Sequence, residues 1–264
     1  MKLFSIFGDP VSHSRSPLMH NSVFKCLDLN ACYTRTHLTE GSQLRDVFFA
    51  KALSGANVTV PHKEAAYAQC DEVRGIAKTI QAVNTLVLEN GKLIGYNTDA
   101  EGFMRAIESF GALRNALILG AGGTARALSI ALRQGSITPT ILNRSQGRLE
   151  YFKNEGIESY IWDNFTPTPY DLIINTTSAG LSDDELPLEK SLLMTLLSQT
   201  KGAIDVIYGK ETPFLREVKA TALPYKDGSD MLLAQGVLAN HLFLNGAYPL
   251  SVIEPPMKAS FSLS

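Results

Sequence analysis

The stretch Asn115-Ala-Leu-Ile-Leu-Gly-Ala-Gly-Gly-Thr-Ala125 decides the fold of this chain. Residues 115–119 form an almost wholly apolar run, which is typical of a parallel strand that is buried on both faces. The spacing G-x-G-x-x-A follows at once, and a helical segment continues over residues 126–131. A strand, a glycine-rich turn and a helix in this order predict the start of a dinucleotide-binding βαβ unit.

Each small residue of this turn has a physical reason. Gly120 permits the tight turn, Gly122 lets a pyrophosphate approach the backbone, and Ala125 allows the helix to pack closely on the strand. The free N–H groups and the dipole of the helix start favour an anion without any charged side chain. A glycine turn that only joins a strand to a helix is the alternative. The candidate cofactor-binding residues are Gly120, Ala121, Gly122, Gly123, Thr124 and Ala125.

The next predicted strand, residues 138–142, indicates which dinucleotide binds. NAD sites usually place an acidic residue about 20 positions after the turn, and that carboxylate would repel a 2′-phosphate. Here the strand is followed by Asn143, Arg144 and Ser145, with Arg148 one turn later. A guanidinium group binds phosphate through a planar pair of donors. The cofactor is therefore predicted to be NADP, with two ordinary surface arginines as the alternative.

The rest of the chain alternates between β-rich and helical segments, which predicts an α/β fold with mainly parallel strands. Asn90-Gly91 lies between two β-rich runs and predicts a hairpin with a type I′ turn. The other expected strands are residues 2–7, 31–38, 56–60, 158–161, 171–175 and 203–206, and the expected helices are 16–27, 42–53, 99–110 and 230–245. Pro255-Pro256 and the serine-rich end predict only a short segment or a frayed tail.

Composition excludes several classes of function. The 264 residues carry a formal net charge of −2, which provides no broad basic field for nucleic acid, and no apolar run is long enough for a membrane span. The beginning of the sequence has no signal-peptide pattern, so we expect a cytoplasmic protein. Three cysteines without CxxC spacing and the positions of His13, His20 and His62 do not suggest a metal site; surface or packing roles are expected for these histidines.

Four polar segments in the first hundred residues call for an explanation: Ser12-His-Ser-Arg-Ser-Pro17, Asn57-Val-Thr-Val-Pro-His-Lys63, Ala82-Val-Asn-Thr85 and Gly95-Tyr-Asn-Thr-Asp99. Taken singly, each has a structural explanation, because Ser, Asn, Asp and Pro commonly cap helices and end strands. Together with the glycine-rich turn and Asn143-Arg-Ser145, however, their order and spacing closely resemble the shikimate dehydrogenase family over nearly the whole chain. Further matching segments are 175–178, 205–208, 212–213 and 227–235.

The resemblance implies reversible reduction of 3-dehydroshikimate to shikimate with NADPH, a step in aromatic amino acid biosynthesis. It also implies two α/β domains. Residues 1–99 with 229–264 would form an N-terminal substrate-binding domain with a mainly parallel sheet. Residues 100–228 would form a C-terminal Rossmann-type domain that binds NADP.

The family motifs also assign candidate site residues. Ser14 and Ser16 would bind the substrate carboxylate, and Tyr208 would lie where the substrate ring and the nicotinamide meet, with Gly228 beside it. The residues expected to line the hydroxylated ring are Asn57, Thr59, Lys63, Asn84, Asp99 and Gln235. The further cofactor contacts would be Thr176, Ile207, Gly228 and Met231.

Two of these residues suit the chemistry of the reaction. Adding hydride to a ketone creates alkoxide charge, which a nearby ammonium group can stabilise and protonate. Lys63 is the candidate proton donor, and Asp99 can orient it and accept a substrate hydroxyl. A solvated lysine at a helix start is the alternative for Lys63. A relative that also oxidises quinate, and a non-catalytic NADP sensor, remain open, as does the choice between a monomer and a homodimer.

Overall fold

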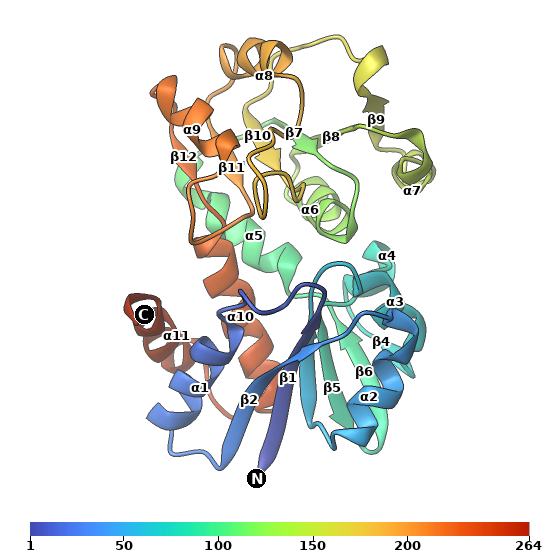
Figure 1. Cartoon of the computed structure of the whole chain (residues 1–264), viewed down its shortest axis with the longest axis vertical. Helices are drawn as coiled ribbons and strands as arrows, with labels where there is room; N and C mark the ends of the chain where they lie inside the picture. The colour runs from blue at the N-terminus through green and yellow to red at the C-terminus, as the bar shows by residue number, and fades with distance from the viewer. Residues whose placement is uncertain (264) are drawn as a thin grey trace. The chain divides into compact units, whose positions relative to one another are not determined.

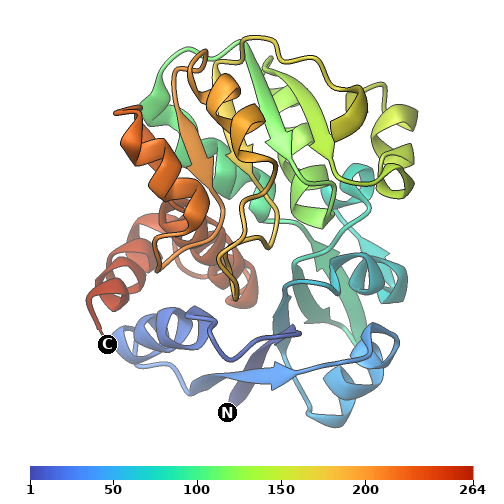
Figure 2. The same cartoon turned by 45° about the horizontal axis from the view of Figure 1, so that its top comes forward.

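The computed structural model describes residues 1–263, which divide into two compact units (Figures 1 and 2). The first unit contains Met1–Gly102 and the residues from Leu233 onward, and the second contains Phe103–Leu232. Both units combine a six-stranded sheet with helices. The α/β class predicted from the sequence is therefore confirmed.

The sheet of the first unit is mixed, with strand order β2-β1-β3-β5-β6-β4. Strand β1 pairs in parallel with β2 and β3, whereas β5 runs antiparallel to β3 and β6. The β5–β6 turn has φ of 50° at Asn90 and 77° at Gly91, so both residues take the predicted left-handed conformation. The strands are β1 (Lys2–Gly8), β2 (Ala31–His37), β3 (Gly55–Val58), β4 (Glu72–Val73), β5 (Thr85–Glu89) and β6 (Lys92–Tyr96).

Helices cover both faces of this sheet (Figure 1). Alternation along β1 sends Phe4 and Ile6 into a cluster with residues of α1 and α10, while Phe7 enters a cluster with residues of α2 and α3. The helices of this unit are α1 (Ser16–Cys26), α2 (Leu44–Ala50), α3 (Lys63–Gln69), α4 (Ala77–Ile80), α10 (Ser229–Phe243) and α11 (Leu250–Ala259), of which α10 begins in the second unit.

The expectation of a short or frayed tail is wrong for the described residues. Helix α11 runs through both Pro255 and Pro256, packs against α1 and buries Ile253 and Met257. Proline removes two helical N–H donors, but the acceptors they leave belong to Ser251 and Val252, which are exposed to water. Burial of the apolar face therefore outweighs the lost hydrogen bonds.

The segment after α11 is attached to the rest of the first unit through Arg15. Its Nη2 donates to the carbonyl oxygens of Ser260 at 3.0 Å and Leu263 at 2.8 Å. The guanidinium group also lies over the ring of Phe261, 5.9 Å from the centroid. Arg15 directly precedes α1, so this end of the chain is held at the start of that helix.

The sheet of the second unit is wholly parallel, with strand order β12-β11-β10-β7-β8-β9. Strand β7 has the predicted bounds and is central. The strands are β7 (Asn115–Leu119), β8 (Thr138–Asn143), β9 (Glu158–Ile161), β10 (Leu172–Asn175), β11 (Ala203–Asp205) and β12 (Tyr225–Lys226). The helices are α5 (Asp99–Ile107), which begins in the first unit, α6 (Gly123–Gln134), α7 (Glu150–Asn154), α8 (Lys190–Leu197) and α9 (Pro213–Ala220).

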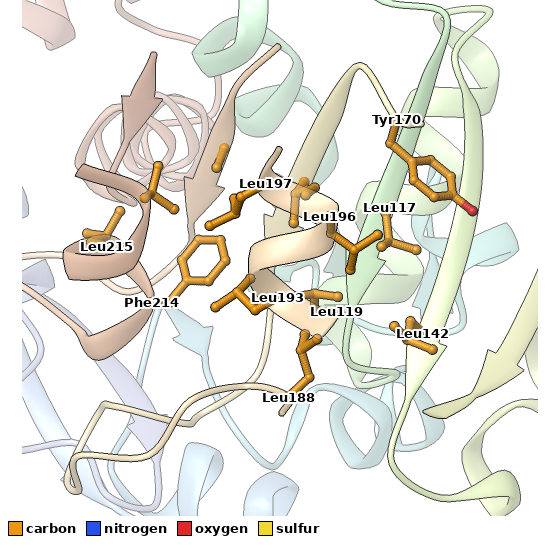
Figure 3. Close-up of a cluster of buried hydrophobic side chains, with 13 residues drawn as sticks. Leu117, Leu119, Leu142, Tyr170, Leu188, Leu193, Leu196, Leu197, Phe214 and Leu215 are labelled. Atoms are coloured by element: carbon orange, nitrogen blue, oxygen red, sulfur yellow. The ribbon is translucent and has the colours of Figure 1, made fainter. Parts of the chain in front are cut away.

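Strand β7 is buried on both faces, as its apolar sequence predicts. Leu117 and Leu119 point into a cluster with leucines of α8 and with Phe214 of α9 (Figure 3), while Ala116 and Ile118 face the opposite side and are also fully buried. This packing fixes the carboxyl end of β7, and the glycine-rich turn starts at that point.

Candidate functional site

A buried ion pair lies in the first unit where α3 and α5 begin. Lys63 is the first residue of α3 and Asp99 the first of α5. The Lys63 Nζ atom donates to Asp99 Oδ2 at 2.7 Å, and the two residues are only 9% and 6% exposed. Asn84 Nδ2 donates to the other carboxylate oxygen at 2.9 Å. The structure thus brings together Lys63, Asp99 and Asn84, and a solvated Lys63 is excluded.

Stability alone does not account for this pair, because desolvation of two charges offsets most of their attraction. Buried charges of this kind occur more often where chemistry needs them. An ammonium group beside a carboxylate can donate a proton and can stabilise a developing negative charge. The arrangement is therefore suited to transferring a proton to or from an oxygen atom.

The two candidate carboxylate-binding serines are adjacent at the start of α1. The hydroxyl of Ser14 donates to that of Ser16 at 3.2 Å, and both residues are buried. Arg35, on β2, holds the loop through two hydrogen bonds to the Ser14 carbonyl, from Nε at 3.0 Å and Nη2 at 2.6 Å. A helix start with two hydroxyl groups and a nearby guanidinium charge is favourable for an anion.

The remaining ring-lining candidates of the first unit lie on β3, directly after it, and in the middle of α10. Asn57 is buried in β3, and Thr59 follows it, with its backbone N–H bonded to the Phe7 carbonyl at 2.8 Å. Gln235 lies in α10 with its backbone against Gly102 of α5, where an added Cβ would be 2.8 Å from the Gln235 nitrogen. The structure describes the position of each candidate but contains no ligand that would test its role.

In the second unit, the glycine-rich turn joins β7 to α6 as predicted. Gly120 has φ of +103°, and a Cβ there would lie 2.9 Å from Thr176 Oγ1, so the turn requires glycine. That hydroxyl donates to the Leu119 carbonyl at 2.7 Å and closes the end of β10 against β7. Gly122 is the N-cap of α6 and has no side chain to occupy the N–H groups of the first turn.

The predicted phosphate-binding residues follow β8 on the same unit. Asn143 ends the strand, and its Nδ2 donates to the Ser145 carbonyl at 2.7 Å, which shapes the turn. Arg144 and Arg148 are both exposed. Among residues 1–263 no hydrogen bond or ion pair occupies either guanidinium group, so both are available to an anion.

A buried aspartate organises the loop that contains Ile207 and Tyr208. Asp205 ends β11, and its carboxylate accepts from Thr212 Oγ1 at 2.5 Å and from the Ile207 N–H at 3.0 Å. Burial raises the pKa of Asp205, and these hydrogen bonds partly oppose the shift. The buried Asp205 carboxylate therefore fixes both ends of the segment from Ile207 to Thr212 through hydrogen bonds.

Gly228 and Met231 lie next to this loop. The Gly228 N–H donates to the Ile207 carbonyl at 3.0 Å, and an added Cβ would be 2.1 Å from the Val206 oxygen. Met231 is buried in the first turn of α10. Gly228 thus connects the Ile207 loop to the start of α10, the helix that contains Met231.

Sequence reasoning missed the role of three buried residues behind Asn57 and Asn84 in the first unit. Thr85 stands out only as part of a motif, Tyr33 only as part of a strand, and His20 is expected to have a surface or packing role. His20 is indeed packed: its ring stacks on Tyr33 with centroids 4.4 Å apart and planes 8° from parallel. Burial lowers the pKa of His20 to about 3. Tyr33 could have been found from the sequence, because it is a residue with a polar group at an inward-facing position of a strand, β2.

Two kinds of feature are absent from residues 1–263. No helix of this part of the chain is both long enough and apolar enough to span a membrane. Likewise, no group of three histidine, cysteine or acidic side chains within it could hold a metal ion.

Comparison with known proteins extends over the whole length of the chain. Residues 6–86 match the family model described as the shikimate dehydrogenase substrate binding domain. The chain is 46% identical over 260 residues to a protein of Helicobacter hepaticus named shikimate dehydrogenase (NADP(+)), covering 98% of this chain and 97% of that protein. A protein of Helicobacter pylori strain 26695 with the same name is 42% identical, with 99% of each chain covered.

Solved structures agree with this similarity. A shikimate 5-dehydrogenase of Thermus thermophilus, in complex with NADP(H) and shikimate, is 34% identical with a TM-score of 0.81, over 98% of this chain and 100% of that one. Shikimate dehydrogenase 1 of Peptoclostridium difficile has a TM-score of 0.87 at 26% identity, over 99% and 98% of the two chains.

Proposed function

Because the chain belongs to the shikimate dehydrogenase family, we propose that it catalyses the reversible, NADP-dependent reduction of 3-dehydroshikimate to shikimate in aromatic amino acid biosynthesis. The observation that carries the proposal is the buried Lys63–Asp99 pair, with its 2.7 Å contact and the Asn84 amide beside it. A binding protein without turnover would have no use for a desolvated proton donor. The names of relatives that match over their full length support the same substrate and cofactor.

The cofactor fits the residues of the second unit. The N–H groups at the start of α6 suit a pyrophosphate, and the exposed guanidinium groups of Arg144 and Arg148 suit a 2′-phosphate. At Gly122 an added Cβ would meet nothing within 4 Å, so the backbone there is open to close approach. When bound, NADPH supplies the hydride. We assign residues 100–228 to this cofactor domain and residues 1–99 with 229–264 to the substrate domain.

In this proposal, residues of the first unit bind the substrate and move the proton. Ser14 and Ser16 bind the carboxylate of the ring, and Asn57, Thr59, Asn84 and Gln235 bind its hydroxyl groups. The resemblance also assigns a substrate contact to Tyr208, a residue of the second unit. The Lys63 ammonium group donates a proton to the oxygen that gains negative charge, and in the reverse direction the neutral amine accepts it. Asp99 orients the ammonium group through the 2.7 Å hydrogen bond.

The proposal is tested with a panel of substrates and cofactors on the purified protein. Shikimate with NADP should produce NADPH absorbance, with a higher kcat/KM than shikimate with NAD or quinate with NADP. Equal rates with quinate would broaden the assignment to a quinate/shikimate dehydrogenase. No turnover with tight NADP binding would instead favour a sensor.

Two finer assignments accompany the activity. We place the protein in the cytoplasm, where intermediates of amino acid biosynthesis are found, and fractionation of cells checks this. The protein acts as a monomer or a homodimer, and light scattering at working concentration decides between these two states.

A further inference from the structure

A continuous chain of side-chain hydrogen bonds runs through the first unit from Tyr33 to the Lys63–Asp99 pair. Tyr33 OH donates to Asn57 Oδ1 at 2.7 Å, and Asn57 Nδ2 donates to Thr85 Oγ1 at 3.1 Å. Thr85 Oγ1 donates to Asn84 Oδ1 at 2.9 Å. Asn84 Nδ2 then donates to Asp99, whose other oxygen accepts from Lys63. The chain thus ends at the groups to which proton transfer is assigned.

The backbone fixes which way both amides point. Asn84 Oδ1 accepts from the backbone N–H of Thr98 at 2.8 Å, and an N–H group can only donate. Asn57 Nδ2 donates to the backbone carbonyl of Asn84 at 3.2 Å, and a carbonyl can only accept. Each amide therefore has one orientation that satisfies its surroundings. In that orientation Asn84 presents a donor, and not an acceptor, to the Asp99 carboxylate.

Thr85 connects the two amides through a single hydroxyl group. Its oxygen accepts a hydrogen bond from Asn57 Nδ2, so its own O–H is directed to Asn84 Oδ1, the nearest acceptor, rather than to Thr98 Oγ1 at 3.4 Å. Removing this hydroxyl leaves one N–H of Asn57 without its acceptor. It also removes one of the hydrogen bonds to Asn84 Oδ1, which then keeps only those from the backbone N–H and the hydroxyl of Thr98. A rotated Asn84 would turn its oxygen toward Asp99, where like charges repel.

Thr85 cannot act by contact with a ligand, because it is 0% exposed in the middle of the sheet. Tyr33 at the far end is also buried, between the His20 ring and Asn57. Asn240 Nδ2 lies 2.8 Å from His20 Nδ1 and completes the support behind the tyrosine. We therefore expect a specific effect of these residues on turnover to pass through the hydrogen-bond chain, which a control outside the chain can separate from general loosening of the unit.

We propose that Thr85 is a positioning residue for the reaction, which fixes the Asn57 and Asn84 amides and through them the Asp99 carboxylate and Lys63 ammonium group. Tyr33 holds the far end of the same chain. The inference rests on the proposed function for its effect on turnover, although the fixed geometry of Lys63 can be observed without any substrate.

The test compares Thr85→Val, which removes the hydroxyl at nearly constant volume, with Thr85→Ser, which keeps it. Thr36→Val is the matched control, because it breaks a buried hydroxyl contact with Ser5 at 2.8 Å in the same unit, outside the chain. We expect kcat for shikimate oxidation to fall about 10-fold to 100-fold in Thr85→Val, the equivalent of one buried hydrogen bond. KM for NADP should stay unchanged, and Thr85→Ser should recover most of kcat.

A second variant and a spectroscopic measurement keep the proposal testable if Thr85→Val folds poorly. Tyr33→Phe interrupts the chain at its other end and should lower kcat in the same direction. The ¹⁵N signal of the Lys63 ammonium group, assigned by its absence in Lys63→Met, should shift or broaden in Thr85→Val and Tyr33→Phe. It should stay unchanged in Thr85→Ser and Thr36→Val.

The outcomes separate this inference from the proposed function. An inactive parent protein refutes the function, whereas the ammonium signal still decides whether Thr85 fixes Lys63. The inference is overturned if folded Thr85→Val retains the parental kcat and signal, or if Thr85→Ser is impaired as severely as Thr85→Val. If Thr36→Val lowered kcat as much as Thr85→Val, the effect would come from general loosening of the unit and the inference would be overturned.

Discussion

Replacing Lys63 with methionine should cost both catalysis and stability, and the stability loss should depend on pH. The variant nearly keeps the length of the side chain and removes its charge. Asp99, which is only 6% exposed, then has a buried carboxylate without its ammonium partner. Breaking a buried ion pair in this way costs about 3–5 kcal/mol. The loss has a ceiling, because the carboxyl group can take up a proton instead.

The ceiling follows from the free energy of protonation. A carboxyl group with an ordinary pKa of about 3.9 in the unfolded chain costs about 4 kcal/mol to protonate at pH 7 and about 1.5 kcal/mol at pH 5. We therefore expect Lys63→Met to be destabilised by about 3–4 kcal/mol at pH 7, a fall in Tm of roughly 6–16 °C. At pH 5 the destabilisation should shrink to about 1.5 kcal/mol or less.

Thermal unfolding at both pH values measures this difference, with the double variant Lys63→Met, Asp99→Asn as the control. Removing the unpaired charge should restore most of the stability at pH 7, while kcat stays roughly 100-fold to 10,000-fold below the parent because the proton donor is missing. Equal destabilisation at pH 5 and pH 7, or no recovery in the double variant, would refute the reasoning. An unchanged kcat in Lys63→Met would remove the lysine from the mechanism.

Three further predictions concern other parts of the molecule. His20 stays neutral in the fold because burial lowers its pKa to about 3, so stability should fall as pH drops from about 6.5 toward 3, by up to about 1.4 kcal/mol per pH unit. His20→Gln should flatten that part of the unfolding profile, and an identical slope would contradict the assignment. Arg144→Ala should weaken NADP binding by roughly 1.5–3 kcal/mol in titration calorimetry and leave NAD nearly unaffected, whereas equal losses would show that Arg144 does not discriminate. Gly228→Ala should lose about 1–3 kcal/mol or more in denaturant unfolding, because the new Cβ would lie 2.1 Å from the Val206 oxygen, whereas Gly122→Ala meets open space and should unfold like the parent.

Local chemistry made much of the fold predictable. Strand β7 and the Asn90-Gly91 turn were found because a long apolar run and a pair of residues with positive φ each have few alternative structures. Helix α11 was missed because Pro255-Pro256 is a strong local signal against a helix. The signal was overridden by burial of Ile253 and Met257 against α1, a contact between distant parts of the chain.

The candidate site shows the same division. Lys63 and Asp99 could be proposed from the sequence because they lie in motifs that resemble the family and suit proton transfer, but the 2.7 Å contact between them depends on how α3 and α5 meet. Thr85 carried no distinct signal, because threonine is an ordinary residue in a strand. Its importance lies in one hydroxyl group between two amides, which only the register of β3 with β5 reveals.

The attachment of the last described residues to Arg15 has a practical consequence for purification. Carbonyl oxygens of Ser260 and Leu263 bind the residue that separates Ser14 from Ser16. An affinity tag appended to this end of the chain would pull on the serine loop, whereas Met1 is largely exposed and offers a freer point of attachment. Kinetic work on this enzyme should therefore use a tag at Met1, or a tag that is cleaved before KM for the acid substrate is measured.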